Sequence, residues 1–333
     1  MRFKSSFVKG ISIAMACLLS SYVISSMMFE NFLQSVYALN NFKFGSVGDW
    51  GCNSNTQKTV NNIKSKLPVR VLALGDYSYK STATCWFNII QPIDSKTKIV
   101  IGNHEDQNSE GFKQYMSHFG LSKPYYSFNY QNVHVLVMAT DSSYSSGSSQ
   151  YNFVKNDLKV ASQDRNINWI IVMIHKPLYS SPNTCISSSC KGSTSLVNTY
   201  HPLFDKYKVD LVLEGHVHNY QRTYPIKYNP NSALSPIKTS RNAFDYNDPE
   251  GEIFVIVGTG GINFHGLSGQ SSFVKYQQAI RFGQLEIAIL NNENKLSAKF
   301  FSNDGTVLDH FSIKKGSSSR SLIENNDPFS LLR

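Results

Sequence analysis

Residues 169–175 read Trp-Ile-Ile-Val-Met-Ile-His, six apolar side chains followed by a histidine. A short apolar run of this kind is typical of a strand buried on both faces, as in a parallel sheet covered by helices. Similar runs lie at 42–48, 69–74, 98–101 and 210–213, and segments with helical spacing, such as Val60, Ile63 and Leu67, alternate with them. After residue 250 the helical spacing disappears and the remaining apolar runs indicate strands. The pattern predicts the α/β class, with two packed mixed β-sheets flanked by helices on both outer faces.

The composition excludes several classes of protein. The chain has 333 residues, a formal charge of +9, 17% charged residues and 41% hydrophobic residues. An intrinsically disordered chain would have more charge and fewer apolar residues. A polytopic membrane protein would need several apolar runs of about twenty residues, and only the N-terminal part of this chain could hold one. The basic residues form no dense run, so no specific nucleic-acid partner is expected, and the diffuse positive field suits small phosphate esters.

The N-terminal residues 1–38 predict an export signal, with an uncleaved membrane anchor as the alternative. Arg2, Lys4 and Lys9 give a basic start, an apolar stretch follows, and Val-Tyr-Ala at 36–38 fits a small-x-small cleavage site. We therefore expect a secreted or cell-envelope protein that contacts a membrane only through an uncleaved N-terminal segment. The folded domain is expected over residues 39–315. Residues 316–333 are Ser-rich and lack a periodic apolar face, which predicts a mobile tail.

Four cysteines lie beyond the predicted export segment. In an exported chain an even number of cysteines suggests disulfides, here Cys52–Cys85 and Cys185–Cys190. Four cysteines allow three connectivities, and buried free thiols are a second alternative. A structural zinc site is a weaker one, because the chain has no C-x-x-C pair.

Five short motifs follow apolar runs, and in α/β sheets the carboxyl ends of strands meet at one crevice. They are Gly48-Asp49-Trp50-Gly51, Gly75-Asp76-Tyr77-Ser78-Tyr79, Gly102-Asn103-His104-Glu105, Val172-Met173-Ile174-His175 and Gly215-His216-Val217-His218. Their oxygen and nitrogen donors outnumber the ligands of one tetrahedral zinc ion. The set suits two ions that share a bridging carboxylate. Carboxylate, phenolate and imidazole together favour iron, manganese or zinc over calcium.

The order and spacing of these motifs resemble the purple acid phosphatases, a branch of the calcineurin-like metallophosphoesterases. The family motifs GDxG, GDxxY, GNH(D/E), VxxH and GHxH are all present, in order, between Gly48 and His218. The segments WIIVMIHKPLY (169–179) and GHVHNYQRTY (215–224) also resemble the corresponding segments of the family. The resemblance implies a four-layer α/β/β/α metallophosphoesterase sandwich, with residues 39–315 as the catalytic domain.

The resemblance also implies two metal ions, a ferric ion and a divalent iron, zinc or manganese ion, bridged by Asp76. The implied ligands of the ferric ion are Asp49, Asp76, Tyr79 and His218. The implied ligands of the divalent ion are Asp76, Asn103, His175 and His216. Tyr77 is a near neighbour of Tyr79, and the register of the motif favours Tyr79.

The implied activity is that of an acid phosphatase, which hydrolyses phosphomonoesters by attack of a metal-bound hydroxide. Asp76 and His104 would be the catalytic residues. His104 matches the pocket histidine of the family and would orient the substrate or protonate the leaving alkoxide, with Glu105 or Asp106 tuning its pKa. One alternative is a phosphodiesterase that acts on nucleotides or lipids with the same metals. Another is a catalytically weak phosphate- or metal-binding envelope protein.

Several residues outside the ligand set have more ordinary interpretations. His201 is expected on the surface or in helix packing, and Arg222 could contact a substrate or form a supporting salt bridge. The glycine-rich stretch 258–261 lacks the lysine and helix of a P-loop, which favours a turn at the rim of the site. Plant-type large members place paired histidines in the segment that corresponds to 180–190, which has none here. The histidines that match no motif are His118, His134, His265 and His310.

Overall fold

The computed structural model describes Met28 and residues 41–316. Apart from Met28, the predicted export segment lies outside the described residues, as does the predicted tail beyond Gly316. Among the described residues, no helix is long and apolar enough to cross a membrane.

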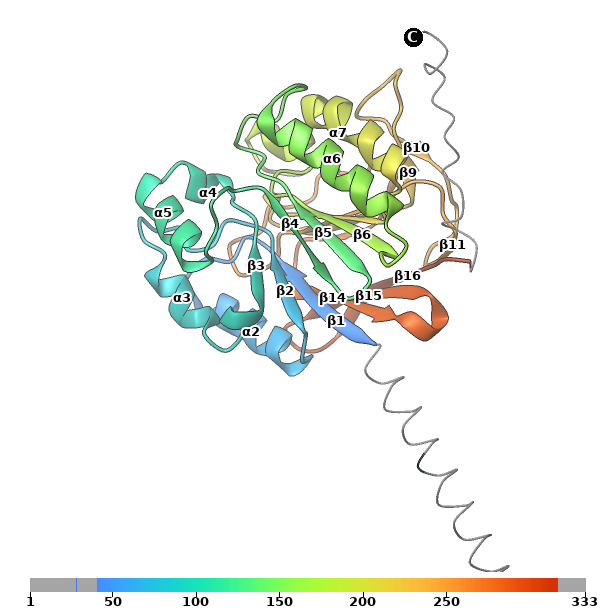
Figure 1. Ribbon diagram of the computed structural model, residues 1–333. Helices are drawn as coiled ribbons and strands as arrows, with labels where there is room; N and C mark the ends of the chain where they lie inside the picture. Colours follow the sequence, from blue (N-terminus) through green and yellow to red (C-terminus); the bar gives the residue numbers. More distant parts are fainter. Residues whose placement is uncertain (1–27, 29–40, 317–333) are drawn as a thin grey trace, which may run out of the picture.

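Two seven-stranded mixed sheets form the centre of the molecule (Figure 1). In order across the first sheet, the strands are β11 (Asp245–Asn247), β16 (Val307–Lys314), β15 (Lys295–Ser302), β14 (Gly283–Leu290), β1 (Phe42–Val47), β2 (Arg70–Ala73) and β3 (Thr97–Ile99). Across the second they are β13 (Val274–Gln278), β8 (Tyr220–Thr223), β12 (Ile253–Val257), β7 (Leu211–Glu214), β6 (Trp169–Met173), β5 (Val133–Val137) and β4 (Tyr126–Tyr130). The short strands β9 (Ile226–Lys227) and β10 (Ile237–Lys238) pair separately.

Helices cover both outer faces and complete the predicted four-layer α/β/β/α sandwich. The helices are α2 (Ser54–Ser65), α3 (Thr84–Ile90), α4 (Asn103–Asp106), α5 (Ser109–His118), α6 (Ser149–Gln163) and α7 (Thr194–Tyr207). Short 3₁₀ turns lie at Asp94–Lys96, Ser188–Lys191 and Asn291–Glu293. The α2 helix begins where the Asn53 side chain accepts hydrogen bonds from two backbone N–H groups of the first turn, as an N-cap residue does.

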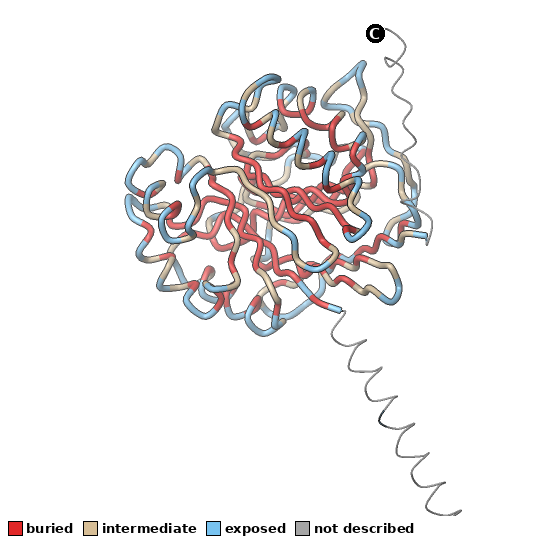
Figure 2. Tube along the Cα trace, in the orientation of Figure 1, coloured by how far each residue is buried: buried red, intermediate tan, exposed pale blue. Residues whose placement is uncertain are grey.

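The β6 strand shows how the layers form. Trp169, Ile171 and Met173 point into the core between the two sheets, whereas Ile170 and Val172 pack against the helices that cover the second sheet. All five residues of β6 are fully buried. The prediction of a strand buried on both faces is therefore confirmed, and Figure 2 shows the same burial along the central strands of both sheets.

Both predicted disulfides are present. Cys52–Cys85 joins the loop after β1 to α3, with its Cα atoms 6.0 Å apart. Cys185–Cys190 closes a loop between β6 and α7, with its Cα atoms 6.1 Å apart. The alternatives of free thiols and of a zinc site are wrong.

The helix predicted from Val60, Ile63 and Leu67 ends earlier than its spacing suggests. Val60 and Ile63 are buried on α2, but α2 ends at Ser65 and Leu67 is 78% exposed. Leu67 has a left-handed backbone, with φ of 53°, so it belongs to the turn that leads into β2.

Candidate metal centre

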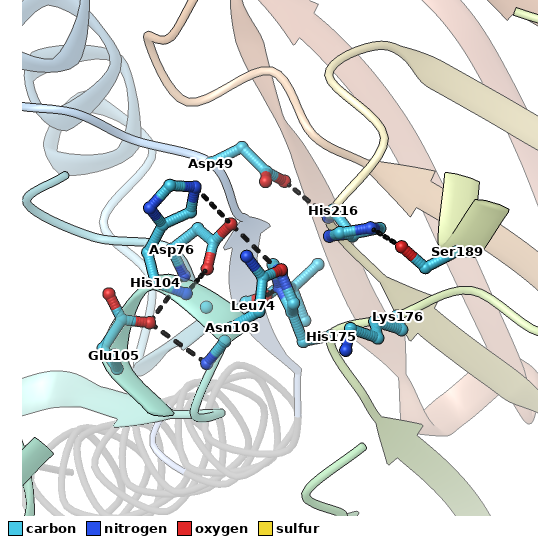
Figure 3. A network of polar contacts seen from close by, with 12 residues as sticks. Asp49, Leu74, Asp76, Asn103, His104, Glu105, His175, Lys176, Ser189 and His216 are labelled. Atoms are coloured by element: carbon cyan, nitrogen blue, oxygen red, sulfur yellow. Dashed lines mark hydrogen bonds and ion pairs between the residues drawn. The ribbon is translucent and has the colours of Figure 1, made fainter. Parts of the chain in front are cut away.

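The five sequence motifs meet at one edge of the two sheets, as expected. The loops with Asp49, Asp76 and Asn103 follow the parallel strands β1, β2 and β3 of the first sheet. The loops with His175 and His216 follow the parallel strands β6 and β7 of the second. Since the carboxyl ends of parallel strands face the same way, both sheets deliver side chains to a common site (Figure 3).

One group of donor atoms gathers around the Tyr79 hydroxyl. Tyr79 Oη lies 3.1 Å from His218 Nε2, 3.4 Å from Asp49 Oδ1 and 3.5 Å from Asp76 Oδ2. His218 Nε2 is also 3.5 Å from Asp49 Oδ1. These four residues are the set that the resemblance assigned to the ferric ion.

A second group gathers around His175. His175 Nε2 lies 3.2 Å from Asp76 Oδ2 and 3.2 Å from Asn103 Oδ1. Donor atoms of Asp76, His175 and His216 all lie within 4.8 Å of one another. These residues are the set assigned to the divalent ion.

The same oxygen, Asp76 Oδ2, faces both groups, as in a carboxylate that bridges two ions through one oxygen. Donors held about 2.0–2.2 Å from one ion lie roughly 3–3.5 Å apart, which matches most of the separations between these atoms. The donor set and its spacing therefore fit two metal ions. The individual ligand roles stay predictions.

Hydrogen bonds to backbone carbonyls orient two of the histidines. His175 Nδ1 lies 2.7 Å from the Leu74 carbonyl oxygen, and His218 Nδ1 lies 2.8 Å from the Asn263 carbonyl oxygen. A proton on Nδ1 satisfies each carbonyl and leaves Nε2 as a lone-pair donor that faces the site. Metal-binding histidines in proteins are commonly held in this way.

Four of the candidate ligands have a left-handed backbone. The φ angles are 60° for Asp49, 53° for Asp76, 52° for Tyr79 and 68° for His216. Side chains other than glycine rarely adopt this conformation, and it persists where the surroundings enforce it, most often at functional sites. The strain therefore marks these loops independently of any motif.

The neighbouring glycines are required by close packing. A Cβ atom on Gly102 would lie 2.2 Å from Asp76 Oδ1, and one on Gly258 would lie 2.9 Å from Asp49 Oδ2. The stretch 258–261 follows β12 as a loop beside the site, and its Gly260 N–H donates to the Gly48 carbonyl oxygen.

The Glu105 side chain holds the loops of Asp76 and Gly102 in place through hydrogen bonds from their backbone. Its Oε2 accepts hydrogen bonds from the backbone N–H groups of Asp76 and Gly102, and its Oε1 accepts one from Tyr77. Glu105 is fully buried with both oxygens occupied by the backbone, so it positions the Asp76 loop. The sequence suggested that Glu105 tunes the pKa of His104, but no direct contact between the two side chains supports this suggestion.

Burial and neighbouring charges shift the pKa values of the metal-free site. Burial, then the charge of Asp76, raises the pKa of Asp49 even though His175 acts in the opposite direction. Burial would also raise the pKa of Asp76, but the charge of His175 and hydrogen bonds from His175 and His104 hold it below its ordinary value. Burial would lower the pKa of His175, and the carboxylates of Asp76 and Asp49 instead raise it to about 10. Burial, then the charge of Asp49, raises the pKa of Tyr79.

The two remaining histidines are driven toward their neutral forms. Burial, then the charge of His175, lowers the pKa of His216 to about 3. Burial, then His265, lowers the pKa of His218 to about 4. Neutral imidazoles are the form that binds a metal.

His104 is the most accessible of the candidate residues. Its side chain is 46% exposed, and its Nε2 lies 3.9 Å from Asp76 Oδ2. Its ring packs on the ring of Tyr79, with centroids 4.2 Å apart, and its backbone N–H donates to Asp76 Oδ1. His104 thus lies at the solvent-exposed side of the donor groups.

Two residues near the site were not found from the sequence. Ser189 Oγ lies 2.7 Å from His216 Nε2, in the loop closed by Cys185–Cys190. His265 stacks on His218, with ring centroids 4.0 Å apart, and its Nδ1 accepts a hydrogen bond from the His218 N–H. Both come from loops without motif spacing, so only the folded chain brings them to the ligands.

Two other residues prove to be structural. Arg222 is fully buried and ion-paired with Asp309, so the salt-bridge interpretation is confirmed. His201 is fully buried against the second sheet, where its ring contacts Phe254, so it is a helix-packing residue and its placement on the surface is wrong.

Comparisons with known proteins agree with this geometry. The family model described as calcineurin-like phosphoesterase matches residues 42–220. Purple acid phosphatase 22 of Arabidopsis thaliana is 31% identical over 246 residues, which cover 68% of this chain and 51% of that protein. Probable inactive purple acid phosphatase 1 of the same plant is 29% identical over 249 residues, which cover 68% of this chain and 39% of that protein. The chain thus spans about half the length, or less, of the curated relatives it matches.

The fold has a solved counterpart. A purple acid phosphatase from yellow lupin (Lupinus luteus) seeds superposes with a TM-score of 0.72 and 23% identity, over 84% of this chain and 55% of that one. This likeness confirms the fold. The family match extends over more than half of the 333 residues and contains all five motifs, so the chain belongs to the calcineurin-like phosphoesterase family.

Proposed function

We propose that this chain is a metal-dependent acid phosphatase that hydrolyses small phosphomonoesters. The observation that carries the proposal is the position of Asp76 Oδ2, 3.5 Å from Tyr79 Oη in one donor group and 3.2 Å from His175 Nε2 in the other. Two ions held there would bind phosphate oxygens and acidify a water molecule so that it can serve as the nucleophile.

The charge of the ligand set supports this assignment. A ferric ion and a divalent iron, zinc or manganese ion carry more charge than Asp49, Asp76 and Tyr79 neutralise, which leaves roughly two positive charges for a phosphate group. Asn103, a neutral ligand, preserves that excess. The exported location rests on the two disulfides, which are typical of oxidising compartments.

His104 is the chain's own candidate for proton transfer. Its exposed ring stands beside Asp76 and Tyr79, within reach of a substrate on the open side of the site. A protonated Nε2 would donate to a phosphate oxygen or give its proton to the leaving alkoxide. Asp76, which accepts from the His104 N–H, holds the backbone of this residue in place.

Metal content and the visible spectrum of the purified protein test the proposal directly. We expect about two ions bound by the five-motif donor set and a visible absorption band from a ferric tyrosinate. Tyr79→Phe should abolish the band, whereas Tyr77→Phe, the matched control, should leave it. A colourless protein with two zinc ions would disprove the ferric assignment and leave a phosphatase possible.

Substrate tests distinguish the alternatives. We expect faster hydrolysis of p-nitrophenyl phosphate than of bis(p-nitrophenyl) phosphate, and the reverse order would favour the phosphodiesterase. A protein that binds both metals and turns over neither ester would favour a phosphate- or metal-binding role. One observation favours that role, because one relative is described as a probable inactive purple acid phosphatase.

A further inference from the structure

A second cluster of potential metal ligands lies beneath α7. It is separate from the candidate metal centre that the five motifs form at the strand ends, called the strand-end site from here on. His201 and Asp205 stand one turn apart on this helix, and Glu252 comes directly before β12. Ligand atoms of the three residues all lie within 4.8 Å of one another. The side chains of His201 and Glu252 are 0% and 1% exposed, and that of Asp205 is 20% exposed.

Two carboxylate oxygens in this cluster lack hydrogen-bond partners. Glu252 Oε2 lies 3.1 Å from His201 Nε2, but Glu252 Oε1 is buried without a partner. Asp205 Oδ2 accepts a hydrogen bond from the Tyr228 N–H, but Asp205 Oδ1 is buried without one. An unsatisfied buried carboxylate oxygen is costly, so a proton or a cation is needed at this place.

His201 is oriented as a metal-binding histidine would be. Its Nδ1 lies 2.6 Å from Tyr179 Oη, which fixes the ring and leaves Nε2 toward the carboxylates. His201 Nε2 is 3.1 Å from Glu252 Oε2 and 3.9 Å from Asp205 Oδ1. Ligands about 2.0–2.2 Å from one ion lie roughly 3–3.5 Å apart, so a small contraction on the Asp205 side would close the site.

The cluster opens to solvent through an acidic cavity. A surface cavity of about 200 Å³ has Asp205 and Glu252 in its wall, and its other acidic residues are Asp210, Asp248 and Glu250. Lys208 and Lys315 also line it. Two of the three candidate ligands thus border this cavity.

We propose that His201, Asp205 and Glu252 form a separate metal site that takes one divalent transition-metal ion, with Zn²⁺ as the best fit. One imidazole and two carboxylates match the ligand types that zinc accepts. The site would join α7 to the start of β12, and through Tyr228 to the segment after β9. It is independent of the proposed phosphatase activity.

Zinc stoichiometry in paired variants tests this site. Asp205→Asn keeps the shape of the side chain and an acceptor for the Tyr228 N–H but removes the charge. Equilibrium dialysis against ZnCl₂ measures the number of bound ions. We expect Asp205→Asn to lose one tightly bound ion, because its affinity for Zn²⁺ at that site should be at least about 100-fold weaker. Introduced into Asp76→Ala, where the strand-end site is already impaired, Asp205→Asn should again remove one ion. Zn²⁺ should also raise the melting temperature of Asp76→Ala more than that of the double variant.

The control is Asp94→Asn, which alters an exposed His–Asp pair, since Asp94 Oδ1 lies 2.9 Å from His118 Nε2. It should lose no ion. Equal zinc content in Asp76→Ala and in Asp76→Ala/Asp205→Asn would overturn the proposal and indicate that a proton satisfies the carboxyl pair. His201→Gln gives the same comparison if Asp205→Asn fails to fold. Loss of phosphatase activity with this extra ion still bound would concern only the proposed function.

Discussion

Residues Gly215–Tyr224 serve two regions of the molecule that use charge in opposite ways. His216 and His218 lie in the loop at the strand-end site, with donor atoms aimed at other donors. Arg222, four residues beyond His218, lies on β8 and forms two hydrogen bonds with Asp309 on β16, of 2.6 and 2.8 Å. Tyr220 also donates to Asp309, at 2.9 Å. The pair thus joins β8 of the second sheet to β16 of the first.

The two regions differ in what their charged and polar groups bind. The Arg222–Asp309 pair stabilises the fold, whereas the groups at the strand ends are available to a ligand. Arg222 and Asp309 neutralise each other with good geometry on regular strands. At the strand ends, potential metal ligands face one another on loops with left-handed backbone, where a cation would bind several of them at once. Substitutions in the first region should change stability, and those in the second should change metal content and turnover.

Asp76→Ala should give the largest effect. Losing the shared oxygen should remove both metals and lower turnover by at least ~10³-fold, about 4 kcal/mol of activation free energy. Metal analysis and p-nitrophenyl phosphate kinetics measure both quantities. The bridging role would be wrong if the variant kept two ions and near-normal turnover.

Arg222→Met should damage stability instead. Removing one partner leaves the buried Asp309 charge unpaired, which should cost about 3–5 kcal/mol of the free energy of unfolding. Denaturant unfolding measures this cost. Arg222→Met/Asp309→Leu should recover much of the loss, and metal content per folded molecule should stay normal. A double variant as unstable as the single one would mean that packing around Arg222, and no charge effect, dominates.

His104→Ala sharpens the comparison within the site. We expect kcat to fall about 10²-fold, as for the loss of a general acid, with both metals retained. His118→Ala, which removes a histidine from an exposed ion pair, is the matched control and should be neutral. Loss of metal from His104→Ala would instead identify His104 as a ligand.

The last prediction concerns the pH dependence of metal loading, which should be about tenfold per pH unit for each proton released. In the metal-free protein the pKa values of Asp49 and Tyr79 are raised by burial, and that of His175 is raised to about 10 by Asp76 and Asp49. These donors hold protons that a metal must displace, so affinity should rise about tenfold per pH unit for each proton released and fall in acid. Proton release on metal addition in unbuffered solution counts them. An affinity independent of pH would contradict the raised pKa values.

The sheet strands and the site loops were the most predictable parts of the fold. Apolar runs such as 169–174 are long enough to identify buried strands, and their ends carry the motifs. The β8 strand was missed because its Tyr-Gln-Arg-Thr sequence is polar, although the partners of Arg222 and Gln221 let it be fully buried. Residues 225–250, which have no long apolar run, also contain the short strands β9, β10 and β11.

Some residues of the candidate site could likewise be predicted from the sequence and others could not. Ligands that follow a strand within a fixed motif can be placed from sequence, because the strand end determines where they point. Ser189 and His265 depend on how separate loops pack, and the His201 cluster combines a helix with Glu252, which lies 47 residues beyond Asp205 (252 − 205). No local pattern records such contacts.

The strand order has a consequence for how the chain is made. β1 pairs with β14, and β7 pairs with β12, so residues from the C-terminal part of the chain complete both sheets. While the ribosome has released only residues up to 220, β1 and β7 each have one unpaired edge, and such edges invite aggregation. Synthesis must proceed past Leu290 before the loops at Asp49 and His216 gain their full support, so a fragment limited to the family-matching segment should not fold by itself.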